Sequence, residues 1–152
     1  MIQALTGGLL IDGTGRDPVE NASVIIDEHG RIEDVDKIDS LPKGVVVTDV
    51  GGRTIMPGLI DCHVHLFVDL LPLHELAMMP PSYRTIKAVR NAVATLDAGV
   101  TSIRETSGTP VGFKMAAEQD LIPAPRMKIS IAPLSQTGGH GDFLLPSGLE
   151  HP

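Results

Sequence analysis

The chain has 152 residues, a formal net charge of −7 and 42% hydrophobic residues, as is ordinary for a soluble globular protein. Lysine and arginine form no run long enough for a nucleic-acid surface, and charges or prolines interrupt every apolar stretch before the ~20 residues needed to cross a bilayer. We therefore expect neither nucleic-acid nor membrane partners. A single cysteine, and an N-terminus without the basic and apolar regions of a signal peptide, predict a cytoplasmic location.

The first 55 residues predict a small all-β domain. Runs rich in β-branched residues at 4–11, 22–27, 31–35 and 44–50 are typical of strands, and the segments between them carry the glycines and aspartates of turns. This arrangement favours hairpins that pack into a sheet.

The stretch 54–66 is an apolar run that carries two histidines. In a buried strand, alternation places Asp61, His63 and His65 on one face and turns Cys62 toward the packing face, as a core residue. Neutral imidazoles suit zinc and similar divalent ions, and a spacing of two brings both toward a common point. His63 and His65 are therefore predicted metal ligands. The alternative is two buried histidines satisfied by hydrogen bonds.

The remaining elements predict a parallel β/α arrangement. Apolar residues recur at helical spacing over 82–98, with Ile86, Val89, Val93 and Leu96 expected to face inward and Arg84, Lys87, Arg90 and Asn91 outward. Pro57-Gly58 predicts a chain reversal before the first strand, and Gly99 ends the helix. Strands are expected at 100–105 and 127–132, and a second helix at 112–119.

Two further sites stand where these strands end. Arg104 and Glu105 close the second strand, where either a salt bridge or a substrate contact is expected. The glycines around His140 predict a loop that presents this histidine at the same face as His63 and His65. A solvent-exposed surface histidine is the alternative.

The motif Pro57-Gly58-Leu59-Ile60-Asp61-Cys62-His63-Val64-His65 resembles the amidohydrolase superfamily, whose members carry Pro-Gly-x-Ile-Asp-x-His-x-His at the end of the first barrel strand. The resemblance implies an α/β fold, a (β/α)8 barrel that holds one or two divalent metals, with zinc as the default, beside a small β-sandwich domain. A complete barrel takes about 250 residues. The chain is therefore expected to be the N-terminal portion only: residues 1–55 as half of the sandwich and residues 56–152 as the first three β/α units.

The stretch Thr137-Gly138-Gly139-His140-Gly141-Asp142 resembles the branch that includes imidazolonepropionase-like enzymes and metal-dependent Xaa-Pro dipeptidases. By this resemblance His140 contacts the substrate and not the metal. Arg104 is a second substrate-binding candidate, because the branch often has Arg-Asp at that place. The family's remaining ligands and its general base follow later strands that this sequence does not reach, so no catalytic residue is assigned.

These features predict metal-dependent hydrolysis of an amide or peptide C–N bond in a small molecule or dipeptide, with this chain alone inactive. Two alternatives remain open. The first is a metal-binding fragment without turnover. The second is one chain of a split or oligomeric hydrolase, completed by self-association or by a complementary chain, because three β/α units leave an open apolar sheet edge.

Overall fold

The computed structural model describes residues 1–36, 38, 40–68 and 73–142. It divides the chain into two compact units, Met1–Pro57 and Gly58–Pro152. None of the helices in these described ranges is long and apolar enough to cross a membrane. The described residues form a mixed α/β structure, in which a mixed sheet is followed by a parallel β/α segment.

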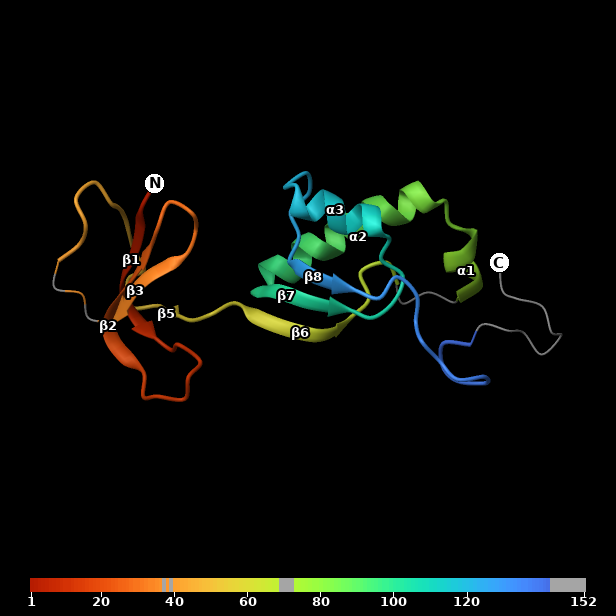
Figure 1. Cartoon of the computed structure of the whole chain (residues 1–152), viewed down its shortest axis with the longest axis horizontal. Coiled ribbons are helices and arrows are strands. Elements are labelled where there is room, and N and C mark those ends of the chain that lie inside the picture. The colour runs from red at the N-terminus through yellow and green to blue at the C-terminus, as the bar shows by residue number, and fades with distance from the viewer. Residues whose placement is uncertain (37, 39, 69–72, 143–152) are drawn as a thin grey trace. The chain divides into compact units, whose positions relative to one another are not determined.

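The first unit is a mixed sheet of five strands (Figure 1). Its strands follow one another as β1 (Gln3–Leu10), β2 (Val19–Ile26), β3 (Ile32–Asp36), β4 (Val46–Asp49) and β5 (Thr54–Ile55). The first three pair antiparallel in the order β3-β2-β1, and β4 and β5 both pair parallel to β1. The predicted strands are confirmed. Their buried residues Leu10, Ala22 and Val24 form the core of this unit.

The second unit is a parallel three-stranded sheet in the order β6-β7-β8, with strands at Leu59–Val64, Val100–Glu105 and Arg126–Ile129. Helix α2 (Pro81–Asp97) packs on β7 and α3 (Val111–Glu118) on β8, while α1 (Leu73–Met78) precedes α2. Both longer helices lie on the same face of the sheet (Figure 1). The carboxyl ends of the three strands therefore meet at one edge, where parallel α/β folds carry their sites.

The inward face of α2 differs in part from the predicted one, although Val89 packs against the core as expected. Ala88 and Ala92 are fully buried, whereas Ile86, which was expected to face inward, is 66% exposed. Two alanines one turn apart let the helix axis approach the sheet closely. The end of the helix is as predicted, because Gly99 adopts the positive φ of +86° that stops a helix.

Two polar residues of α2 that were expected to face outward instead reach the loop after β6. Asn91 Nδ2 donates a hydrogen bond of 2.8 Å to the carbonyl of Leu66, and Arg84 Nη2 donates one of 3.4 Å to that of Phe67. Carbonyls just beyond a strand have left the sheet ladder and need donors when they are buried. The outward assignment was therefore wrong for Arg84 and Asn91.

Three expectations about the strands are also corrected. Residues 59–63 of β6 are all exposed, Ile60 to 70%, because β6 lies at the edge of the sheet that the described strands form and pairs there with β7 alone. No turn forms at Pro57-Gly58, and the chain enters β6 directly. Strand β8 stops at Ile129 and not at residue 132, since Ile131 takes a φ of +65°, which no strand allows.

Candidate metal centre

The two histidines of the motif lie side by side at the end of β6. His63 belongs to the strand and His65 follows its last residue, and both are exposed. Their rings meet edge to face, with centroids 5.1 Å apart and planes at 80°. The intervening Val64 and the following Leu66 pack against the core of the unit. Alternation therefore separates the imidazoles from the packing face.

This separation fits two imidazoles that share one ion. With nitrogen–metal distances of about 2.0–2.1 Å and tetrahedral angles, two ring centres lie roughly 5 Å apart, and the observed value is 5.1 Å. Catalytic zinc takes three protein ligands as a rule. Within the described ranges, no group of three histidine, cysteine or acidic side chains is gathered around a common point. The pair is thus suited to be part of a divalent-metal site.

Asp61, two residues before His63, is engaged with the backbone. Its Oδ1 accepts a hydrogen bond of 3.0 Å from the amide of His63. Asp142, in the loop that carries His140, accepts one of 2.7 Å from the amide of Gly138. Each of these carboxylates thus binds a backbone amide close to it in the sequence: that of Asp61 within β6 and that of Asp142 in the loop after β8.

Arg104 reaches across to β6. Its Nε donates a hydrogen bond of 2.7 Å to the carbonyl of Cys62. The neighbouring Glu105 is only 1% exposed and lies on the opposite face of β7, so the two charges do not form the salt bridge that was one of the two expectations. Cys62 itself is exposed, and its assignment as a buried core residue was wrong because, among the described strands, β6 has a neighbour on one side only.

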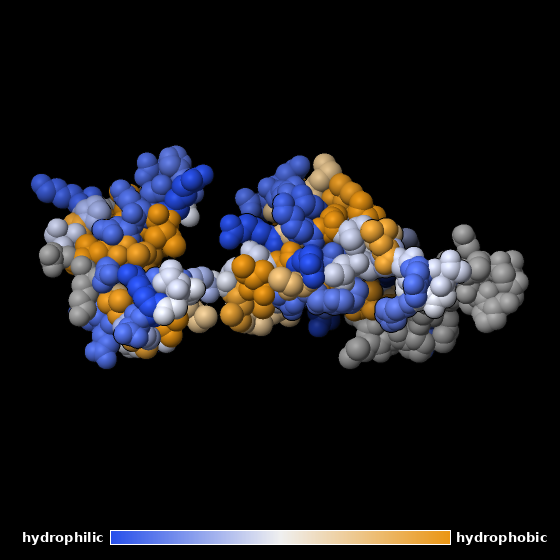
Figure 2. All heavy atoms as spheres, turned by 60° about the horizontal axis from the view of Figure 1, so that its bottom comes forward, coloured by the Kyte–Doolittle hydropathy of each residue, from blue (hydrophilic) through white to orange (hydrophobic). Residues whose placement is uncertain are grey.

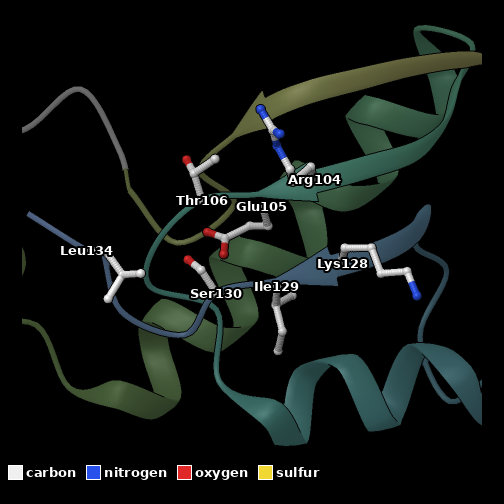
Figure 3. Close-up of a pocket in the computed structure, with 7 residues that line it drawn as sticks. All are labelled: Arg104, Glu105, Thr106, Lys128, Ile129, Ser130 and Leu134. Carbon is white, nitrogen blue, oxygen red and sulfur yellow. The ribbon is translucent and has the colours of Figure 1, made fainter.

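An open pocket of about 340 Å³ lies where β7 and β8 end (Figure 3). Its lining consists of residues at or just beyond the ends of these strands: Arg104, Glu105, Thr106, Lys128, Ile129, Ser130 and Leu134. The carboxyl group of Glu105 is directed toward the side of the pocket where Ser130 lies (Figure 3). Thr106 and Ser130 carried no signal in the sequence beyond following a predicted strand or lying within one.

Glu105 is a buried carboxyl group in this region. Neither carboxylate oxygen has a hydrogen-bond partner among the residues that the structure describes, and the same holds for the buried hydroxyl of Thr109. Burial raises the pKa of the Glu105 carboxyl. Nearby groups lower this pKa again in part: the hydroxyl and amide of Thr109, the amide of Ser107 and the charge of His65. None of them forms a well-formed hydrogen bond with the carboxylate oxygens. Uncompensated burial of a carboxylate is costly, which favours the protonated form.

This pKa shift predicts a pH-dependent stability. The folded chain keeps the Glu105 proton at pH values where the unfolded chain has lost it, so the contribution is complete below about pH 4.3 and is lost as the pH rises through the folded pKa. We expect the unfolding free energy of the wild type, minus that of Glu105→Gln, to fall between pH 4 and pH 8 in urea titrations. Glu75→Gln, which removes an exposed carboxyl of α1, controls for net charge. If the difference in unfolding free energy stays constant or rises with pH, the pKa of Glu105 is not raised in the folded chain.

His140 lies in a tight loop after β8. Gly138 adopts a φ of +73°, and the amide of Gly141 donates to the hydroxyl of Ser135 over 3.1 Å. A Cβ at Gly139 would collide with that same hydroxyl, so the glycines are needed for the turn, as expected. The side chain of His140 is exposed. In the described part of the chain, no metal-type cluster includes it.

Comparison with known proteins places this arrangement in a family. Residues 54–148 match the model of the amidohydrolase family. Ochratoxinase of Aspergillus niger is 33% identical over 155 residues, which cover 97% of this chain and 32% of ochratoxinase. Imidazolonepropionase of Burkholderia cenocepacia is 28% identical over 137 residues, covering 71% of this chain and 33% of that enzyme.

A solved structure of a prolidase is similar to this chain over its whole length. A prolidase complexed with N-methylphosphonate-L-proline matches the whole chain with a TM-score of 0.89 and 36% identity, over 37% of the prolidase. The chain thus spans about a third of the length of the relatives it matches. The family match covers most of the chain and includes both histidines of β6, Arg104 and His140. On these grounds the chain belongs to the amidohydrolase family.

Proposed function

We propose that this chain provides His63 and His65 as the first metal-binding residues of a metal-dependent hydrolase that cleaves an amide or peptide C–N bond. The observation that carries the proposal is the pair of exposed imidazoles, 5.1 Å apart, at the carboxyl end of a parallel strand. In this proposal the β/α units of the second unit are the opening part of a (β/α)8 barrel, and later strands supply the remaining ligands and the general base.

The chemistry divides between the metal and the chain. When bound, a divalent ion makes water a nucleophile at neutral pH and polarises the scissile carbonyl. His63 and His65 would hold it as neutral nitrogen donors, for which zinc is the default. Arg104 uses Nε on the carbonyl of Cys62, which leaves its terminal nitrogens for a substrate carboxylate. The exposed imidazole of His140 is the second candidate for substrate contact.

Substrates of dipeptide type are the first class to test. The support is the match to a prolidase that is complexed with N-methylphosphonate-L-proline, a proline-containing ligand. An open pocket with Arg104 and Lys128 on its wall is suited to a small anionic substrate.

The test uses the longest natural polypeptide that contains this chain. Metal content is measured after dialysis, and hydrolysis is followed on a panel of Xaa-Pro dipeptides and N-acyl amino acids. We expect one or two divalent ions per chain and a hydrolysis that stops with a chelator and returns with zinc. Absence of bound metal, or hydrolysis that ignores the chelator, contradicts the proposal. Bound metal with no turnover on any amide supports the non-catalytic alternative.

The exposed edge of β6 favours a second candidate, in which another chain completes the site. Leu59 is 50% exposed and Ile60 70%, and hydrophobic side chains are visible on the surface of the second unit (Figure 2). A strand with one unpaired edge and exposed apolar side chains is a template for further strands. A polypeptide that is active as a monomer in sedimentation removes this candidate, whereas activity that requires association supports it.

A further inference from the structure

Strand β6 is irregular immediately before the point where it presents its histidines. Asp61 pairs with Ile103 of β7, and Val64 pairs with Glu105. Between these pairs β6 has two residues, Cys62 and His63, where β7 has only Arg104. This is a β-bulge, which takes backbone groups out of the ladder and redirects the neighbouring side chains.

Two side chains bind the backbone groups of this bulge. Asp61 Oδ1 accepts the hydrogen bond from the His63 amide over 3.0 Å, and Arg104 Nε donates to the Cys62 carbonyl over 2.7 Å. Arg104 is also the residue that faces the bulge across the ladder. One acidic and one basic side chain therefore hold the two halves of the same peptide unit.

Beyond the bulge the chain is fixed by other contacts. The amide of Thr106 donates to the carbonyl of Val64 over 3.0 Å, and Asn91 binds that of Leu66 over 2.8 Å. Leu66 is itself 2% exposed, in the core. The peptide between Cys62 and His63 is therefore the place where the backbone of the histidine pair would move if Asp61 and Arg104 did not hold it.

We propose that Asp61 and Arg104 are positioning residues, which lock the bulge at Cys62–His63 and so set the spacing of the two imidazoles for one metal ion. This inference rests on the proposed metal role of His63 and His65. It gives the carboxylate of Asp61 a backbone partner in place of a metal, and gives Arg104 a task besides substrate contact.

Arg104 is tested first, in the longest natural polypeptide, by zinc affinity and by the absorption spectrum of the cobalt-substituted protein. Removing a group that orients a ligand commonly weakens metal binding by about tenfold to a hundredfold, and we expect this loss for Arg104→Met. Arg104→Lys, which keeps a charged donor, should restore part of the affinity. The matched control is Arg126→Met, the same substitution at an exposed arginine of β8 that pairs with Ser102 and does not line the pocket, and it should bind zinc like the wild type.

Asp61 offers a sharper pair of variants. In Asp61→Asn the side-chain amide oxygen can still accept the hydrogen bond from the His63 amide, whereas Asp61→Ala has no acceptor there. We expect Asp61→Asn to stay within a few-fold of the wild-type zinc affinity and Asp61→Ala to lose about tenfold or more. In the metal-free protein, amide hydrogen exchange at His63 should accelerate only in Asp61→Ala. Equal loss in both variants would show that the carboxylate ligates the metal, and would overturn the inference.

The outcomes separate this inference from the proposal on which it rests. His63→Ala serves as the reference for loss of a ligand. If it loses zinc while Arg104→Met and Asp61→Ala bind like the wild type, the inference is wrong and the metal proposal stands. If Arg104→Met changes only the KM of a charged substrate, Arg104 contacts substrate alone and its positioning role is wrong. If the wild type binds no zinc, both fail.

Discussion

Replacing His63 and His65 together with alanine should abolish metal binding and lower turnover at least about a thousandfold in the longest natural polypeptide that contains this chain. A bound metal contributes several kcal/mol to the transition state, and each 1.36 kcal/mol corresponds to tenfold in rate. The two rings lie on one face of β6, at the separation expected of imidazoles on one ion. Each single variant should lose most of the affinity, because the remaining donors keep an incomplete site.

The measurements are zinc per chain after dialysis and kcat/KM on the substrate found most active in the panel. His29→Ala is the control, since His29 lies exposed in a turn of the first unit. It should bind metal and turn over substrate like the wild type. If the double variant keeps its metal content and its turnover, this would falsify the proposed role of the pair, because neither imidazole would then be needed to bind the metal.

Strands and helix ends were predicted well where local signals decide them. The range of β7 was predicted as observed, and Gly99 ends α2, because β-branched runs and positive-φ glycines act through a few neighbouring residues. The inward face of α2 was predicted less well. Ala88 and Ala92 are fully buried, while Ile86 stays exposed. Which face packs is a tertiary choice that periodicity alone does not make.

The sequence pattern at the strand ends predicted which residue types lie there but not which contacts they make. Two histidines at a spacing of two predicted a shared face, and their rings lie 5.1 Å apart. The hydrogen bond from Arg104 to the Cys62 carbonyl depends on the bulge in β6. The register of a strand pair cannot be predicted from the sequence of either strand alone. Burial of Glu105 depends likewise on the loop that follows β7, where Thr109 is fully buried. Long-range contacts of this kind need the folded chain.

Gly58, the second residue of the motif, lies where a side chain has no room, and its replacement gives the second large effect. A Cβ at Gly58 would lie 2.7 Å from the Cβ of Thr101 and still closer to the other two side-chain atoms of that residue. Thr101 is β-branched and cannot turn away from the contact. We expect Gly58→Ala to lower the free energy of unfolding by about 1–3 kcal/mol, as overpacking does. Urea unfolding of the chain measures the change.

The displacement should also reach the metal pair, since Leu59 opens β6 by donating to the carbonyl of Gly99 over 2.9 Å and the bulge follows three residues later. Gly112→Ala is the matched control: Gly112 lies in α3 with open space around its Cα, so alanine should stabilise by about 0.4–1 kcal/mol. Adding Thr101→Ala to Gly58→Ala removes two of the three clashing atoms and should recover part of the loss. If Gly58→Ala is as stable as the wild type, β6 can shift freely against β7, and the glycine of the motif is not needed for the close approach of these strands.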